Sequence, residues 1–261
     1  MMMIRVVVGG ATGKLGRMVC ELVTEQEDMQ LVGGVVSASS ESVGEPLPSG
    51  VSIVGADRLA EAIRGADVYV DLTSPAAAEI NLPVVQLKGV NIVLGTTGIS
   101  ADAMIGLRAS LRATGASAVV APNFSVGVNV FFKTCDDLAR ALPEYDVEII
   151  EVHHSMKRDA PSGTARRAAK IISEATGVEN MAHGRVGVVG ARGREIGMHS
   201  VRAGDVVGEH TVIFAGRKER IELTHRAHSR EAFAEGCVLA IRWIAGRRDG
   251  EVHSMEEVLG L

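Results

Sequence analysis

The sequence has few aromatic residues, few cysteines and no long apolar run, and each absence excludes a class of protein. Aromatic side chains make up only 3 % of the 261 residues, whereas glycine occurs 30 times. This balance fits an α/β enzyme with many turns better than an all-β sandwich. The three cysteines, Cys20, Cys135 and Cys237, are odd in number and far apart, so neither a disulfide framework nor a metal cluster is indicated. We expect all three to be buried as small apolar side chains.

The sequence also lacks the features of membrane, exported and nucleic-acid-binding proteins. No stretch approaches the roughly 18 consecutive apolar residues that cross a bilayer, and the first residues show no signal-peptide pattern. The net charge of −5 argues against a basic face for nucleic acid. We therefore expect a cytoplasmic protein whose ligand is a small molecule, with no membrane or nucleic-acid partner.

Short apolar runs alternate with helical stretches from the N-terminus to about residue 122. Such alternation predicts βαβ units and a Rossmann-type, doubly wound parallel sheet. The segment 37–52 is rich in Ser, Gly and Pro and is expected to form an exposed loop. The expected strands are residues 4–8, 31–36, 51–54, 68–71, 91–94 and 118–121.

A glycine-rich turn follows the first expected strand. Gly10, Gly13 and Gly16 follow a G-x-x-G-x-x-G spacing that runs from the end of strand 4–8 into a helix expected over 15–26. In dinucleotide-binding proteins such glycines allow a tight turn, close approach of the backbone to a pyrophosphate and close packing of the helix on the sheet. The position of the turn favours a dinucleotide site, although a glycine-rich turn in an ordinary α/β unit has the same spacing.

Ligands in doubly wound sheets bind beyond the carboxyl ends of the strands. Four segments directly follow expected strands and are predicted to form the rim of one site: 10–16, 71–75, 95–98 and 121–124. An NAD site commonly has an acidic residue after its second strand, but Ser37, Ala38 and Ser39 stand there. The 2′-phosphate of NADPH is therefore tolerated, and Ser37, Ser39, Lys14 and Arg17 could contact it. A strong arginine clamp is missing too. The sequence therefore leaves three interpretations open: binding of NADH, binding of NADPH, and a loop that does not contact the nucleotide.

The pattern changes after residue 123. Alternation of apolar and polar residues at 221–224 predicts a sheet with one face exposed or covered by another subunit. We expect a second α+β domain built on an open mixed sheet, over 124–228, and a first domain made of 1–123 plus about 229–261. The expected elements are helices 128–142, 164–174 and 230–247 and strands 147–152, 209–214 and 220–224.

Residues 151–165, EVHHSMKRDAPSGTA, concentrate proton donors, acceptors and positive charge. His153 and His154 are adjacent at the end of an expected strand, so they point to opposite sides and are expected to have different tasks. Lys157 follows closely. Zinc would need three or four suitably spaced ligands, and neither cysteine nor further histidine is near in sequence, so no metal is expected.

An anion site is predicted where this segment enters a helix. The first N–H groups of a helix have no partner within it, so Ser162, Gly163 and Thr164 could offer amides and hydroxyls to a carboxylate or phosphate while Lys157 adds charge. The remaining histidines carry no supporting pattern, and surface or strand positions are expected for them: His183, His199, His210, His225, His228 and His253.

The segment 151–165 resembles the signature of the 4-hydroxy-tetrahydrodipicolinate reductase (dihydrodipicolinate reductase) family. Further blocks similar to the family follow the family order, at 95–98, 123–129, 201–211 and 229–236. The resemblance covers essentially the whole chain. It implies an oxidoreductase that uses NADH or NADPH to reduce 4-hydroxy-tetrahydrodipicolinate to tetrahydrodipicolinate with loss of water, in diaminopimelate and lysine biosynthesis. It also implies a homotetramer.

The resemblance further implies roles for single residues. His153 would be the proton donor or acceptor and Lys157 a proton donor, whereas His154, Gly163 and Thr164 would bind the substrate. The family usually has an acidic or basic residue where Ser37 and Ala38 stand, so the preference for one nucleotide is open. The residues expected at the nucleotide are Gly10, Ala11, Thr12, Gly13, Lys14, Leu15, Ser37, Gly95, Thr96, Thr97, Ala121, Pro122, Asn123 and Phe124.

Two other readings of the sequence remain. A different imine or aldehyde reductase, or an amino-acid dehydrogenase, would share the nucleotide domain. A nucleotide-sensing protein would keep that domain without turnover. The set of His153, Lys157 and the 162–164 turn disfavours a sensor, which has no need of a proton donor beside an anion site.

Overall fold

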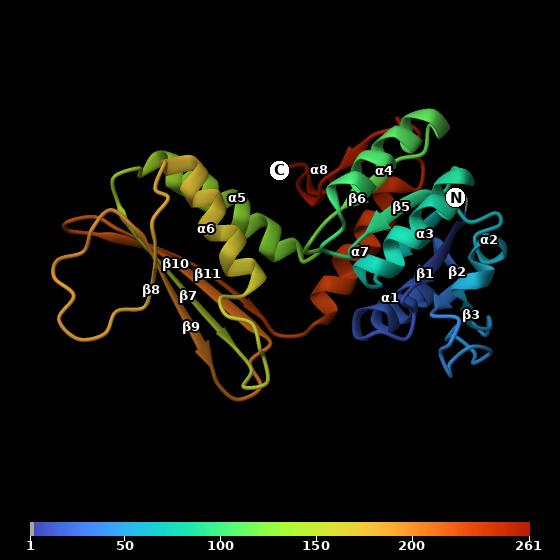
Figure 1. Ribbon diagram of the computed structural model, residues 1–261, viewed down its shortest axis with the longest axis horizontal. Coiled ribbons are helices and arrows are strands. Elements are labelled where there is room, and N and C mark those ends of the chain that lie inside the picture. Colours follow the sequence, from blue (N-terminus) through green and yellow to red (C-terminus); the bar gives the residue numbers. More distant parts are fainter. Residues whose placement is uncertain (1–2) are drawn as a thin grey trace. The chain divides into compact units, whose positions relative to one another are not determined.

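The computed structural model describes residues 3–261 and divides the chain into two compact units (Figure 1). Unit 1 consists of the chain up to Val126 together with Glu231–Leu261, and unit 2 is Gly127–Arg230. Unit 2 is therefore inserted into unit 1 as a continuous segment. None of the helices among residues 3–261 is both long and apolar enough to cross a membrane.

Unit 1 is built on a seven-stranded sheet whose strand pairs are all parallel. The strand order is β12-β6-β5-β4-β1-β2-β3, so the chain starts in the middle and winds outward in both directions. This confirms the doubly wound fold expected from the alternating pattern. The strands are β1 (Ile4–Gly9), β2 (Met29–Val36), β3 (Val54–Gly55), β4 (Val68–Asp71), β5 (Asn91–Leu94), β6 (Ala118–Val120) and β12 (Val252–His253).

Helices cover both faces of this sheet because its strands are apolar on both sides. Val6 and Val8 of β1 lie in one core cluster with residues of α1 (Lys14–Glu25) and α7 (Glu231–Ile244). Val7 lies in the opposite cluster with residues of α3 (Pro75–Leu87) and α4 (Ala101–Thr114). The shorter helices of the unit are η1 (Ala56–Arg58), α2 (Leu59–Ala62) and α8 (Met255–Leu259).

Unit 2 is built on a five-stranded mixed sheet of order β11-β10-β7-β9-β8. β10 runs antiparallel to β7 and β11, whereas β7, β9 and β8 are parallel to one another. The helices α5 (Val126–Ala141) and α6 (Gly163–Thr176) share one apolar core with the sheet. The strands are β7 (Asp146–His153), β8 (Met181–His183), β9 (Ile196–Arg202), β10 (Gly208–Ala215) and β11 (Arg220–Ala227).

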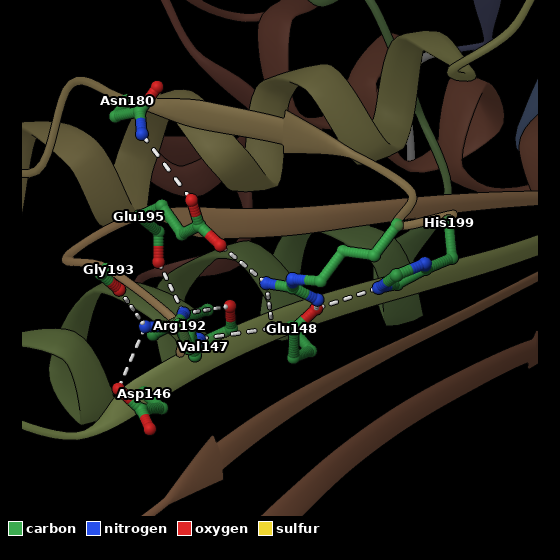
Figure 2. Close-up of polar contacts among 9 residues, drawn as sticks. Asp146, Val147, Glu148, Asn180, Arg192, Gly193, Glu195 and His199 are labelled. Atoms are coloured by element: carbon green, nitrogen blue, oxygen red, sulfur yellow. Dashed lines mark hydrogen bonds and ion pairs between the residues drawn. The ribbon is translucent and has the colours of Figure 1, made fainter. Parts of the chain in front are cut away.

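The sheet of unit 2 carries a charged network centred on Glu148, on the side of β7 opposite the apolar core (Figure 2). Its carboxylate binds His199 of β9 at 2.7 Å and also Arg185 and Arg192 from the segment between β8 and β9. Burial alone would raise the pKa of Glu148, but these hydrogen bonds outweigh it and hold the pKa at about 2. The network ties the 184–195 segment to the sheet.

The elements missed from sequence are short or polar. Strand 51–54 is wrong, because only Val54 and Gly55 pair with β2 and Ser52 forms an isolated bridge with Pro46. β8, β9 and β12 were not predicted; their partly exposed residues give no apolar run. The loop 37–52 is exposed as expected except at Leu47, which lies in the core of unit 1. All three cysteines are buried, as predicted.

Candidate active site

The turn between β1 and α1 requires its glycines. Gly10 has a positive φ of 77°, and a Cβ there would lie 2.3 Å from the carbonyl oxygen of Leu72. A Cβ at Gly16 would lie 2.0 Å from the carbonyl oxygen of Gly10. The turn is therefore tight, and the first turn of α1 packs directly against it.

The start of α1 is arranged as an anion site would be. Gly13 is the N-cap, and no side chain among residues 3–261 caps the helix. Uncapped N–H groups at a helix start attract a phosphate. Lys14 is exposed beside them. The turn thus fits the pyrophosphate of a dinucleotide.

A cavity of about 430 Å³ lies next to this turn, at the carboxyl ends of β1, β2 and β4. Its lining holds two of the predicted rim segments and the expected selectivity position, but no carboxylate and no arginine. A nucleotide with or without a 2′-phosphate is therefore compatible with it. The lining residues are Gly10, Thr12, Val35, Val36, Ser37, Ala38, Ser40, Ala56, Thr73, Ser74, Ala77, Ile80 and Asn81.

The buried carboxylate of Asp71 connects the segments that follow β4 and β5. Its Oδ1 accepts hydrogen bonds from the hydroxyls of Thr96 at 2.6 Å and Thr73 at 2.7 Å, and Tyr69 donates to Oδ2 at 3.1 Å. The Thr73 amide in turn donates to Thr96 Oγ1 at 2.8 Å. The side chain of Thr96 is therefore held inside the rim by Asp71, a role of Asp71 that its place in the segment 71–75 does not predict.

The segments after β5 and β6 also meet. A Cβ at Gly95 would lie 2.6 Å from the ring of Phe124, and the amide of Ala121 donates to the carbonyl of Leu94 at 3.0 Å. Asn123 accepts from the amide of Ser125 at 2.9 Å. Thr97 and Pro122 are exposed. The structure thus links all four predicted rim segments within unit 1, while the 95–97 and 121–124 residues stay outside the cavity lining.

In unit 2, the predicted proton-transfer residue His153 is the last residue of β7 and is 9 % exposed. Its Nδ1 lies 2.5 Å from Oε2 of Glu151. Burial lowers the pKa of His153, and the carboxylate of Glu151 partly offsets this. His154, next in the chain, is half-buried.

Glu151 is 1 % exposed and accepts hydrogen bonds from several groups besides His153. Arg202 of β9 makes two hydrogen bonds with it, both of 2.9 Å, and the amide of Ser162 donates to Oε1 at 3.1 Å. Burial would raise the pKa of Glu151, but the hydrogen bonds from Arg202, Ser200 and His153 outweigh it and bring the pKa to about 2. The carboxylate is ionised in the folded protein.

Ser162 is the N-cap of α6, which begins at Gly163, one residue before the predicted helix start. Its hydroxyl accepts from the amide of Ala165 at 3.1 Å and lies 2.9 Å from Nε2 of His210. Because its amide binds Glu151, both polar groups of Ser162 have partners inside the protein. A direct contact of Ser162 with substrate stays a prediction. Gly163 and Thr164 are exposed and half-buried, respectively.

Lys157 lies in the segment between β7 and α6, with Nζ 2.7 Å from Oδ1 of Asp159. The backbone of Asp159 is itself held, because its carbonyl accepts from Arg202 at 2.6 Å. Lys157, Asp159 and Arg202 therefore form one connected group with Glu151 and His153.

Sequence patterns predict no role for Glu151 and Arg202 of this group, nor for His210, whose Nε2 lies 2.9 Å from the hydroxyl of Ser162. His210 was expected at a surface or ordinary strand position, but it is buried at 4 % and faces the core side of β10. The signal was the alternation in β10, where Gly208, His210, Val212 and Phe214 are all buried. A histidine in step with buried apolar residues indicates an inward side chain. No group of three or more His, Cys, Asp or Glu side chains among residues 3–261 could hold a metal ion.

The two halves of the chain match two models of one known protein family. Residues 4–124 match the model described as dihydrodipicolinate reductase, N-terminus, and residues 127–259 match the one described as dihydrodipicolinate reductase, C-terminus. The chain belongs to the dihydrodipicolinate reductase family. The resemblance drawn from residues 151–165 and the other blocks is thereby confirmed, and with it an oxidoreductase that depends on a pyridine nucleotide.

Similar proteins cover the full length of the chain. The 4-hydroxy-tetrahydrodipicolinate reductases of Methanothermobacter thermautotrophicus and Methanosarcina barkeri are 47 % and 45 % identical, each over 99 % of this chain and 100 % of the relative. That of Myxococcus xanthus is 44 % identical over 99 % and 98 %. The family is thus represented by matches over essentially the whole length of this chain and of each relative.

A solved structure supports the same fold. Dipicolinate-bound dihydrodipicolinate reductase from Paenisporosarcina sp. TG-14 has a TM-score of 0.83 and 29 % identity, covering 98 % of this chain and 99 % of that one. A diaminopimelate dehydrogenase from C. glutamicum has a TM-score of 0.56 at 16 % identity, covering 98 % and 94 %. The second likeness extends to the fold alone.

Proposed function

We propose that this member of the family uses NADH or NADPH to reduce 4-hydroxy-tetrahydrodipicolinate to tetrahydrodipicolinate, with loss of water, in diaminopimelate and lysine biosynthesis. The observation that carries the proposal is the geometry at the end of β7. His153 is backed by the ionised Glu151 next to the start of α6, in a chain that matches the named reductases over its whole length. A proton donor beside a helix start suits a small cyclic dicarboxylate.

On the substrate side, the chain's own residues bind charge and move protons. Gly163 and Thr164 lie in the first turn of α6, where free backbone N–H groups attract a carboxylate. His154 and Lys157 add hydrogen-bond donors to the same site. His153 transfers a proton to or from the ring, and Lys157 is a second donor, so that the negative charge left by reduction is neutralised.

On the nucleotide side, the residues of unit 1 bind and orient. The backbone of Gly10–Leu15 holds the pyrophosphate, and Gly95, Thr96, Thr97 and the 121–124 segment contact the rest of the nucleotide. When bound, the reduced nicotinamide supplies the hydride. Ser37 stands where a charged residue would select one nucleotide, so we expect both NADH and NADPH to be used.

Assembly and location belong to the same proposal. We assign nucleotide binding to residues 1–123 with about 229–261, and substrate binding and subunit contacts to 124–228. The face of the unit 2 sheet that carries Glu148 is opposite the apolar core, and we propose that a neighbouring subunit packs against this side in a homotetramer. A small-molecule biosynthetic reductase of this kind would work in the cytoplasm.

One assay tests the proposal. The protein is mixed with the condensation product of pyruvate and aspartate semialdehyde, and the absorbance of reduced nucleotide is followed with NADH and NADPH in parallel. Consumption that depends on the condensation product supports the proposal, and comparable rates with both nucleotides would show dual use. No consumption of either nucleotide would exclude the reductase. Binding of nucleotide without turnover would favour a sensor.

A further inference from the structure

The carboxylate of Glu151 has no free acceptor site. Oε1 accepts from the Ser162 amide and from Nη2 of Arg202, and Oε2 lies against Nδ1 of His153 and accepts from Nη1 of Arg202. An ionised carboxylate offers about four lone-pair sites in all. These four donor groups, from three residues, use each oxygen twice, and Ser200 adds a further hydrogen bond, so no position remains for a proton on Glu151.

This arrangement determines which nitrogen of His153 carries hydrogen. An ionised carboxylate can only accept, so the group at 2.5 Å must donate. Nδ1 is therefore protonated in neutral His153, and the lone pair is on Nε2. When the ring takes up a second proton, it must do so at Nε2.

We propose that Glu151 is a positioning residue that fixes His153 in the Nδ1–H form and thereby assigns proton transfer to Nε2, with Arg202 keeping Glu151 ionised. The part of the inference that concerns turnover rests on the proposed function. The part that concerns the tautomer does not, since it follows from the hydrogen bonds alone.

The surroundings of Nε2 fit this assignment. Nε2 has no hydrogen-bond partner among residues 3–261 and is not sealed from solvent. It lies against Gly208, the first residue of β10, where an added Cβ would be only 3.1 Å away. The absence of a side chain at 208 leaves the reactive side of the ring open, whereas the Nδ1 side is closed by Glu151.

The charged and titratable groups around His153 come from several elements. Glu151 on its own strand is negative, and Arg202 on β9 compensates that charge. The ring of His210 on β10 has its centroid 5.2 Å from that of the His153 ring. Lys157 and its partner Asp159 lie in the segment that follows β7. The hydrogen bond and charge of Glu151 raise the pKa of His153 against burial, Lys157 and Arg202, which lower it. The hydrogen bond and charge of Glu151 thus favour the protonated ring.

An amide at position 151 would change both properties with little change in shape. Glu151→Gln removes the negative charge, so the pKa of His153 should fall further. It also replaces two acceptor sites by an NH₂ donor, which can face Nδ1 and reverse the tautomer. Tautomer and pH profile are readouts that a purely structural role of Glu151 would leave unmoved.

The first experiment reads the tautomer in the unmodified protein. Nitrogen NMR of histidine-labelled protein at alkaline pH distinguishes a protonated from an unprotonated ring nitrogen, and the signals missing in His153→Gln identify this residue. We expect Nδ1 to be protonated and Nε2 unprotonated. A ring protonated at Nε2, or an equal mixture, would overturn the inference. This measurement requires neither turnover nor a folded Glu151 variant.

The second experiment compares two variants on the same strand. Glu148, three residues before Glu151, also pairs with a histidine and arginines and has a pKa of about 2, but it is on the other side of β7. Glu151→Gln should lower kcat by about 10²- to 10⁴-fold, the contribution of a general acid or base, with the upper end reached when an amide reverses the tautomer of the imidazole. The limb of the kcat/KM profile that reports loss of the His153 proton should move to lower pH. The Kd of the nucleotide should stay within about twofold.

Glu148→Gln is the matched control and should leave the position of that limb unchanged. An equal shift in both variants, or no shift in a folded Glu151→Gln protein, would overturn the positioning role. If wild-type protein shows no reductase activity but the Nδ1–H tautomer is found, the proposed function fails and the tautomer assignment stands. If activity is present and the tautomer is Nε2–H, the reverse holds.

Discussion

The ring of His153 meets the ring of His210 edge to face, with centroids 5.2 Å apart and an interplanar angle of 75°. His210 is buried, its Nε2 lies 2.9 Å from the hydroxyl of Ser162, and its Nδ1 has no partner among residues 3–261. Burial and then the nearby His153 lower the pKa of His210 to about 3. A second, neutral imidazole thus packs beside the one assigned to proton transfer.

Replacement of His210 by glutamine should make the protein less sensitive to mild acid. The folded pKa of about 3 lies below the ordinary 6.5, so the unfolded state binds more protons between these values. The stability contributed by neutral His210 is therefore complete above pH 6.5 and is lost as the pH falls toward 3. Urea unfolding at steps from pH 7 to pH 5 should show a shallower loss of stability for His210→Gln than for wild type. His228→Gln, at an exposed position, is the control and should follow wild type.

Removal of either proposed proton donor should reduce turnover and spare nucleotide binding. We expect His153→Ala and Lys157→Ala each to lower kcat by roughly 10² to 10⁴, the usual contribution of a general acid. Nucleotide Kd, measured by fluorescence, should change little, since both residues are in unit 2. Lys170→Ala on α6 is the control, because Lys170 is exposed and pairs with Glu174 at 3.7 Å. A variant that binds nucleotide poorly but turns over normally would show that the roles are misassigned.

A single methyl group at position 208 should impair the same step. Gly208 has an ordinary φ, so alanine fits the backbone, but its Cβ would lie 3.1 Å from Nε2 of His153. We expect Gly208→Ala to lower kcat by about 10-fold, because displacement of a reacting group by a fraction of an ångström is costly. Gly193→Ala provides a steric comparison in the same unit, since its φ is ordinary and nothing lies within 4 Å of its added Cβ. Unchanged kinetics in Gly208→Ala would place proton transfer elsewhere.

The close approach of α1 to the glycine turn can be tested with a matched pair of glycines. Gly16→Ala would set a Cβ 2.0 Å from the carbonyl oxygen of Gly10, and such overpacking costs about 1–3 kcal/mol. Gly106 is also inside a helix, α4, but an added Cβ there meets nothing within 4 Å. Thermal unfolding should show a lower Tm and weaker nucleotide binding for Gly16→Ala. Gly106→Ala should gain up to about 1 kcal/mol from helix propensity. Equal stability of the two variants would contradict the packing described.

The sequence predicted the parts of this protein that have strong local patterns. Strands β4 and β5 match residue for residue, because their fully buried runs leave only one reading. The sequence does not predict β9, because only its first three residues are buried and the others are partly or fully exposed. β12 is only two residues long and pairs with β6 at the edge of its sheet.

The candidate site also has a part that the sequence predicts and a part that it does not. His153, Lys157 and the 162–164 turn lie close together in the sequence, so the sequence alone predicts that they form one site. Arg202 and His210 reach Glu151 and Ser162 across strand pairings that join distant parts of the chain. No local pattern predicts that register. Glu151 lies in the same sequence segment as His153, but its ionised state depends on hydrogen bonds from Arg202, which is 51 residues away in the sequence.

The insertion of unit 2 into unit 1 has a consequence for synthesis on the ribosome. Val6 and Val8 share their core with Ile241 and Ile244 of α7, which the ribosome delivers after all of unit 2. Unit 1 therefore cannot complete its core until residues 231–261 emerge, and part of its sheet stays uncovered until then. Unit 2 is a continuous segment with its own core and can form first. The half that begins the chain is the half that finishes folding.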